Sequence, residues 1–193
     1  MSSSMLTFYA AVAIAGITVA CIIPLSCKML KSKGVMDNPN ARSSHKIPTP
    51  RGGGIAIIIA IIGGTLVLYV GAITLPTFWI TILFIACGLA CVSWLDDLKG
   101  LSALTRLISQ VIAVSVAIYM DPSLSEYTIW ILPHYLTIPI FAVSWIWFIN
   151  LYNFMDGIDG ITGVETISIC VGLGAMASIG HLPQSFFAPL MII

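Results

Sequence analysis

The sequence predicts an all-α protein, a polytopic transmembrane helical bundle, and two observations support that fold class. Hydrophobic residues make up 59% of the 193 residues and charged residues only 8%, with a mean hydropathy of +1.04. A soluble domain carries far more charge, so the composition indicates a chain solvated by lipid. The apolar residues also fall in long runs separated by short polar links, as membrane-crossing helices require.

A membrane-crossing helix needs about 20 mostly apolar residues, and six runs approach or reach that length. The first run has no basic residue before it and exceeds a signal-peptide core, so we interpret it as a retained helix. The fourth run is short unless residues 104–106 begin it, and a seventh run, 185–193, is too short to cross. The chain therefore reads as one multi-pass membrane domain over residues 1–193. The six predicted spans are residues 5–26, 52–73, 78–95, 107–120, 136–149 (continuing into Asn153) and 164–180.

Counting the crossings places the polar links alternately on the two sides of the membrane. If the link 27–51 is cytoplasmic, links 96–106 and 150–163 are too, and all eight Lys and Arg lie on that side. This asymmetry follows the positive-inside rule and predicts a membrane protein with its N-terminus outside and its polar face toward the cytoplasm. The net charge of zero gives no support for a nucleic-acid partner.

The first polar link combines basic side chains with a triple glycine at the start of the second span. His45, Lys46 and Arg51 come shortly before the glycines at positions 52–54. Exposed N–H groups at a helix start, with basic groups nearby, can form an anion site. Alternatively, the glycines serve helix packing and the bases serve topology, and these residues alone do not decide between the two.

Two adjacent carboxylates, Asp96 and Asp97, end the third predicted span, and Lys99 and Arg106 lie in the charged link after it. Neighbours on a helix point about 100° apart. One carboxylate can therefore meet a divalent metal while the other positions or deprotonates a phosphate oxygen. A solvated helix end is the alternative, but acids at a helix C-terminus oppose the helix dipole, so we favour the functional interpretation.

The third motif runs from residue 150 to residue 163. Asn150, Asn153 and Asp156 are three residues apart, so a helix places them on one face. Asp159 continues the row unless the glycines around it break the helix first. A glycine-rich turn is the alternative, but a turn does not need a polar stripe, and polar groups leaving an apolar helix need partners.

The predicted topology brings all three motifs to one membrane surface. Together they offer oxygen ligands for Mg²⁺ and basic groups for phosphates, which suits phosphoryl transfer at a membrane interface. The competing interpretation is a transporter or ion pathway. A transporter predicts carboxylates near the middle of the bilayer, whereas these carboxylates lie at predicted helix ends.

The segments DNPNARSSHKIPTPRGGG, LDDLKG and NLYNFMDGIDGITG resemble the polyprenyl-phosphate N-acetylhexosamine-1-phosphate transferases, glycosyltransferase family 4, in order and in topology. The PTPRGGG form is more similar to the branch that initiates O-antigen and lipopolysaccharide synthesis. The resemblance implies transfer of an N-acetylamino-sugar 1-phosphate from a UDP-N-acetylamino sugar to undecaprenyl phosphate, with release of UMP. It implies Mg²⁺ as the cofactor, with Mn²⁺ as a substitute, and leaves a homodimer open.

The resemblance also implies roles for single residues. Asp96 and Asp97 correspond to the catalytic acidic pair, with Asp97 as a metal ligand and Asn153 as a ligand of the metal or of the pyrophosphate. Whether an aspartate attacks covalently or only activates the lipid phosphate stays open. The substrate-binding residues implied are Asn150, Asp156 and Asp159, with Asp159 toward the uracil and Asp156 in the nucleotide site, and Arg106, His45, Lys46 and Arg51 toward phosphate.

Members of this family carry further membrane helices and a later aspartate-containing cytoplasmic loop. We therefore expect this chain to be the N-terminal part of such a transferase. An inactive truncated fragment is the remaining alternative.

Overall fold

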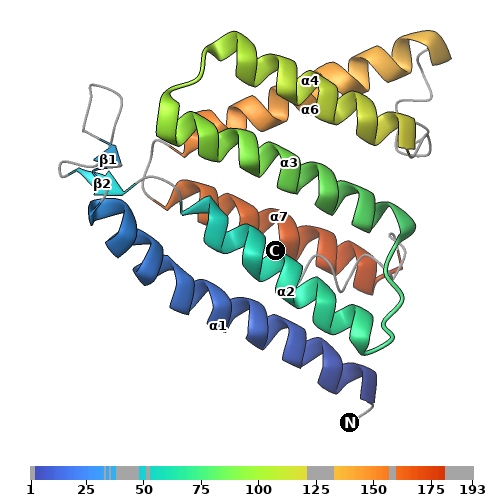
Figure 1. The fold of residues 1–193 in the computed structure, drawn as a ribbon. Coiled ribbons are helices and arrows are strands. Elements are labelled where there is room, and N and C mark those ends of the chain that lie inside the picture. Colours follow the sequence, from blue (N-terminus) through green and yellow to red (C-terminus); the bar gives the residue numbers. More distant parts are fainter. Residues whose placement is uncertain are drawn as a thin grey trace.

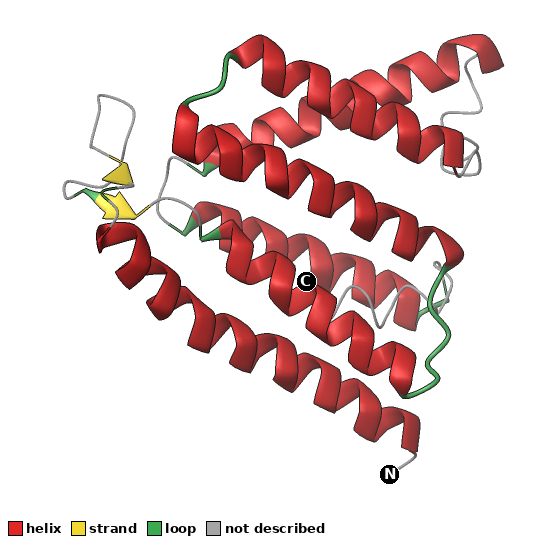
Figure 2. Cartoon of the chain, in the orientation of Figure 1, coloured by secondary structure: helices red, strands yellow, loops and turns green. Residues whose placement is uncertain are grey.

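The computed structural model describes residues 3–32, 34, 36–37, 48–50, 53–120, 133–156 and 160–180. Within these ranges the chain forms helices and one small antiparallel pair of strands, so the all-α class is confirmed (Figure 2). The elements are α1 (Ser3–Ser32), β1 (Met36–Asp37), β2 (Thr49–Pro50), α2 (Gly54–Val70), α3 (Thr77–Lys99), α4 (Ala103–Met120), α6 (His134–Met155) and α7 (Ile161–Ser178).

Five of the described helices, α1, α3, α4, α6 and α7, are long and apolar enough to cross a membrane. α2 is shorter, at 17 residues, and at about 1.5 Å per residue it reaches the lower limit of a spanning helix. Each predicted span therefore corresponds to a helix, and α4 begins early enough to include residues 104–106. The predicted start of a seventh span, 185–193, lies outside the described residues.

Two of the predicted spans, the first and the third, stop four or more residues before the ends of the helices that contain them, and both helices continue to a turn that carries a lysine. α1 continues to Ser32 and α3 to Lys99, so Asp96 and Asp97 lie in a helical turn and the link before α4 shrinks to residues 100–102. Each helix carries a lysine in its last turn, Lys31 and Lys99. A cation there is favourable because the helix dipole is negative at that end.

Neighbouring helices run in alternating directions across the bundle (Figure 1). α1 packs on α2, α2 on α3, α3 on α4, and α4 on α6, while α7 contacts α6. The α1–α2 contact buries Ala11, Ala15, Ala60 and Leu68. Small residues of this kind let helix backbones approach closely in a membrane protein.

The contact between α2 and α3 contains a buried hydrogen bond. Trp79 donates its indole N–H to the Thr65 hydroxyl oxygen over 3.1 Å, and both side chains are buried. The bond satisfies a donor that would otherwise be stranded in an apolar contact. It therefore ties the first turn of α3 to α2, at the end of the bundle away from the sequence motifs.

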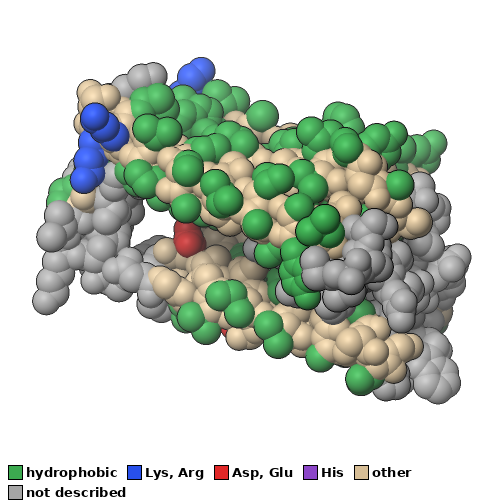
Figure 3. All heavy atoms as spheres, turned by 90° about the horizontal axis from the view of Figure 1, so that it is seen from below, with side chains coloured by type: hydrophobic (Ala, Val, Ile, Leu, Met, Phe, Trp, Pro, Cys, Tyr) green, Lys and Arg blue, Asp and Glu red, His purple; other side chains and the backbone are tan. Residues whose placement is uncertain are grey.

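The ends of the elements that carry the motifs meet at one end of the bundle. There α3 and α6 end, α4 and α7 begin, and β1 and β2 pair beside the end of α1 (Figure 1). We call this the motif end. Figure 3 shows Lys and Arg side chains at one end and apolar side chains along the length of the helices. Large exposed side chains such as Phe84 and Trp147 suit a lipid environment.

Candidate active site at the motif end

Asp96 is held at the end of α3 by backbone and side-chain contacts. Gly100 ends the helix in a left-handed conformation, φ 65°, and its N–H bonds the Asp96 carbonyl over 2.7 Å. The following N–H, of Leu101, donates to Asp96 Oδ1 over 2.7 Å. This donor helps offset the unfavourable position of an acid at a helix C-terminus, so the carboxylate is fixed rather than free to rotate.

Arg106 of α4 reaches back to the same carboxylate. Its Nη1 lies 3.2 Å from Asp96 Oδ2, and the side chains are 44% and 21% exposed, respectively. The three-residue link makes this possible, because Ser102 caps α4 by accepting the Thr105 N–H over 3.1 Å. The sequence left open whether Arg106 ends the link or begins the fourth span, and the structure places it in the first turn of a helix, facing Asp96.

Gln110, one turn further along α4, pairs with Asn150 of α6. Asn150 Nδ2 donates to Gln110 Oε1 over 2.6 Å, and Gln110 Nε2 lies 3.4 Å from Asn150 Oδ1. Asn150 Nδ2 also donates to the Ile146 carbonyl over 2.8 Å. The amide of Asn150 therefore has protein partners, although the sequence predicted it to bind substrate.

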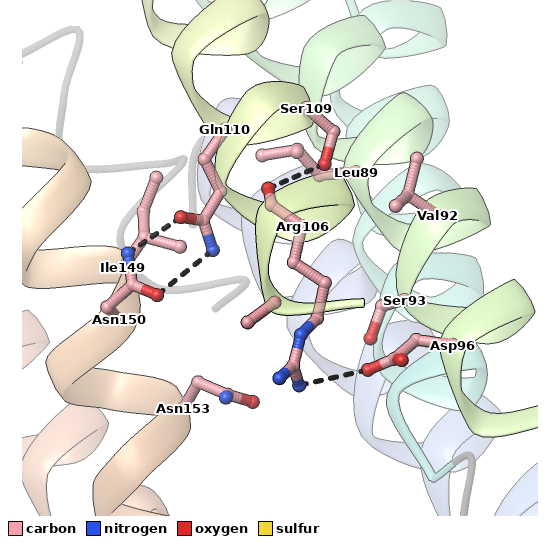
Figure 4. A pocket seen from close by; sticks show the side chains of 11 residues that line it. Leu89, Val92, Ser93, Asp96, Arg106, Ser109, Gln110, Ile149, Asn150 and Asn153 are labelled. Carbon is pink, nitrogen blue, oxygen red and sulfur yellow. Dashed lines mark hydrogen bonds and ion pairs between the residues drawn. The ribbon is translucent and has the colours of Figure 1, made fainter. Parts of the chain in front are cut away.

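These side chains border a hollow of about 220 Å³ between α3, α4 and α6. In Figure 4 the Arg106 guanidinium reaches Asp96 on one side, and Asn153 points toward it from the other. The hollow is therefore lined by a carboxylate, a guanidinium and three side-chain amides, next to apolar side chains. Its lining residues are Leu89, Val92, Ser93, Asp96, Ala103, Arg106, Ser109, Gln110, Ile149, Asn150 and Asn153.

A second group of contacts closes the corner between α6 and α7. Asp156 follows the last residue of α6 and accepts a hydrogen bond at Oδ1 from the Thr162 hydroxyl over 2.9 Å. The Tyr152 and Thr166 hydroxyls lie 3.2 Å apart. These bonds hold the two helices on either side of residues 157–159 and fix the carboxylate of Asp156.

The structure brings together part of the predicted site. Asp96, Arg106, Asn150 and Asn153 line one hollow, whereas Asp97, in the last turn of α3, is not among its lining residues. Asp156 lies at the α6–α7 corner. The other predicted residues, Asp159, His45, Lys46 and Arg51, lie outside the described residues.

Sequence reasoning missed Gln110 and Thr162. Gln110 is four residues after Arg106 and so shares its helix face, and it carries the one side-chain amide of the mostly apolar run 107–120. Thr162 is six residues after Asp156, across a turn whose geometry the spacing does not define. The sequence therefore contained a pattern that could have identified Gln110 as a site residue, but none that could have identified Thr162.

The donor set fits a metal only in part. Asp96 and Asn153 place carboxylate and amide oxygens on one hollow, and such oxygens suit Mg²⁺. No group of three or more His, Cys, Asp or Glu that could hold a metal occurs among the described residues. Mg²⁺ often binds through one or two carboxylates together with substrate phosphates and water, and the residues of the hollow fit that kind of site.

Comparison with known sequences decides the family. Residues 79–193, more than half of the chain, match the model described as glycosyl transferase family 4. The chain belongs to glycosyl transferase family 4. All the residues that line the hollow fall inside the matched segment, so the hollow is built from the part of the chain that defines this membership.

Several bacterial proteins are similar to this member of glycosyl transferase family 4. A decaprenyl-phosphate N-acetylglucosaminephosphotransferase of Mycobacterium tuberculosis is 28% identical over 179 residues, covering 82% of this chain and 44% of its own length. That of Mycolicibacterium smegmatis is 30% identical over 154 residues, covering 72% and 38%. A Bacillus subtilis protein named "Probable undecaprenyl-phosphate N-acetylglucosaminyl 1-phosphate transferase" is 29% identical over 176 residues, covering 83% and 45%. The chain thus spans less than half the length of these relatives. No solved structure matches it significantly.

Proposed function

We propose that the protein transfers an N-acetylamino-sugar 1-phosphate from a UDP-sugar to undecaprenyl phosphate and releases UMP. The observation that carries the proposal is the hollow in which Asp96 and Arg106 form an ion pair beside Asn153. The names of the relatives support a polyprenyl-phosphate acceptor and an N-acetylglucosamine phosphate donor. Membership of glycosyl transferase family 4 supports the class of reaction.

The chemistry is the exchange of one phosphorus–oxygen bond for another. An oxygen of the lipid phosphate bonds to the phosphorus that carries the sugar, and the bond from that phosphorus to the UMP oxygen breaks. UMP leaves with the bonding electron pair, and the product is a lipid pyrophosphoryl sugar. Negative charge gathers on the transferred group, so cationic and hydrogen-bond donors placed beforehand lower the barrier.

Arg106 and Asp96 can have different roles in this reaction. The Arg106 side chain is 44% exposed, and its guanidinium carries more donors than its bond to Asp96 uses, so it can also bind a phosphate oxygen. Asp96 keeps the guanidinium aimed across the hollow toward Asn153 (Figure 4). A carboxylate beside the acceptor phosphate can also take up its proton.

The residues that would hold Mg²⁺, or Mn²⁺ in its place, are Asp97 and Asn153, as the resemblance implies, and Asp96 adds a carboxylate to the hollow that Asn153 lines. Such an ion, when bound, neutralises charge on the pyrophosphate. Asp156 and Asp159 would bind the nucleotide, and His45, Lys46 and Arg51 would contact phosphate. The motif end would face the cytoplasm of an inner-membrane protein, where the product would start O-antigen or another cell-envelope glycan.

The test uses the full-length protein as the cell makes it, purified in detergent. We expect release of UMP from a UDP-N-acetylamino sugar that requires both undecaprenyl phosphate and Mg²⁺ and stops when EDTA is added. Asp97→Ala and Asn153→Ala should abolish the release. Wild-type protein that releases no UMP from any such donor would refute the function. Full activity in both variants would refute the site.

A further inference from the structure

The amide pair between Gln110 and Asn150 leaves Asn150 without a proton for a ligand. Its Nδ2 donates one proton to Gln110 Oε1 over 2.6 Å and the other to the Ile146 carbonyl over 2.8 Å. An asparagine amide nitrogen has two protons. A direct hydrogen bond from Asn150 to substrate would therefore require one of these contacts to break.

The contact with Ile146 also decides how both amides are oriented. A backbone carbonyl oxygen only accepts hydrogen bonds, so the Asn150 atom beside it must be the nitrogen. The Gln110 atom 2.6 Å from that nitrogen must then be oxygen. Turning either amide over would place like groups against each other, so the pair has one favourable arrangement.

Helix geometry connects this pair to the reactive side of the hollow. Gln110 lies four residues after Arg106, and Asn150 lies three residues before Asn153. Each amide is thus one turn from a site residue, on the same helix face. All four side chains border the hollow (Figure 4), with the amide pair on the side away from the motif end.

We propose that Gln110 and Asn150 are positioning residues, whose amide pair sets the rotation and depth of α4 against α6. The pair thereby holds Arg106 opposite Asn153. Polar side chains in a membrane helix are expensive to leave unpaired, so the helices keep the register in which both amides are satisfied. The kinetic consequence of this inference rests on the proposed function.

The two residues differ by one methylene, which permits a swap test. Gln110→Asn shortens the reach from α4, and Asn150→Gln lengthens the reach from α6, so the double variant restores the combined length. kcat for UMP release is measured in the full-length protein, per amount of folded protein in the gel-filtration peak. Each single variant should lose about 10- to 100-fold in kcat, as expected for a misplaced reactive group. The double variant should recover most of that loss.

Ser168→Ala is the matched control. Ser168 is an exposed polar residue of α7 whose hydroxyl donates to the Val164 carbonyl of its own helix over 2.8 Å. Its kcat should equal that of the wild type. If each single substitution lowered kcat only by disturbing the local fold, the double variant would carry both disturbances and its kcat would not recover.

One set of results would contradict a positioning role for Gln110 and Asn150. If Gln110→Asn keeps wild-type kcat, Asn150→Gln raises KM for one substrate, and the double variant recovers nothing, then Asn150 binds substrate directly. That result would overturn the proposal.

Thermal unfolding separates this inference from the proposed function. We compare the Tm of the wild type with those of Gln110→Ala, Asn150→Ala and the double variant. Residues that bond each other give non-additive effects, so the second substitution should add little to the first. If the wild type releases no UMP but the Tm values show this coupling, the proposed function fails and the link between α4 and α6 stands. Additive Tm shifts would overturn the amide pair itself.

Discussion

Arg106, in the first turn of α4, lies with Nη1 3.2 Å from Oδ2 of Asp96 in the last turn of α3. The two residues are ten positions apart in sequence, and only residues 100–102 separate their helices. A short link of this kind makes an antiparallel helical hairpin whose ends meet at the motif end. The ion pair is therefore a property of the hairpin itself.

Replacing Arg106 should weaken catalysis in a graded way. Arg106→Ala removes both the charge and the donors, and we expect kcat/KM for UMP release to fall about 100- to 1,000-fold, as for the loss of a preorganised donor. Arg106→Lys keeps the charge but not the planar fork, so its kcat/KM should lie between those of the alanine variant and the wild type. Steady-state kinetics with each substrate varied checks this. Equal kcat/KM in Arg106→Ala and wild type would show that the guanidinium does not meet substrate.

Thr162 should matter for nucleotide binding through Asp156. Thr162→Val removes the hydroxyl that donates to Asp156 Oδ1 over 2.9 Å but keeps the branched shape, whereas Thr162→Ser keeps the hydroxyl. We expect KM for the UDP-sugar to rise in the valine variant by about tenfold, the size of one lost hydrogen bond to a charged group. The serine variant should stay near wild type. An equal rise in both variants would point to packing instead of the hydrogen bond.

The buried bond between Trp79 and Thr65 should contribute to stability and not to catalysis. Thr65→Val leaves the indole N–H without its acceptor, and we expect a loss of about 1 kcal/mol in the free energy of unfolding. Thr65→Ser should keep most of that stability. In a Trp79→Phe background, which has no indole donor, Thr65→Val should have little further effect. The measurement is thermal unfolding in detergent, and an undiminished loss in that background would contradict the assignment.

The topology can be tested by labelling single cysteines in a variant whose five natural cysteines have been replaced. We expect Asp37→Cys, Lys99→Cys and Gly157→Cys to react with a reagent that is applied to the cytoplasmic side of the membrane. Leu124→Cys should react from the other side, because one further crossing separates it from position 99. An impermeant maleimide applied to whole cells and to inverted vesicles distinguishes the sides. Labelling of Lys99→Cys and Leu124→Cys from the same side would disprove the predicted count of crossings.

The boundaries that were missed show where sequence patterns lose information. Hydropathy placed the third span at residues 78–95 because Asp96 is the first charge, but the helix continues to Lys99. A helix does not end where its side chains become polar. It ends where the backbone can be capped, and here Gly100 provides the left-handed residue that does so.

By itself the sequence determined the helical class, the order of the spans and the gathering of the motifs at one end. The physical reason is that hydrocarbon admits only internally bonded backbone, so the length and order of apolar runs decide the topology. Only the tertiary structure decided which side chains pair. Arg106 forms an ion pair with Asp96, Asn150 donates a hydrogen bond to Gln110, and Thr162 donates one to Asp156. These pairings depend on how each helix is rotated and how deep it lies against its neighbour. An almost uniformly apolar helix surface does not encode that rotation, because lipid and protein offer its side chains nearly the same environment.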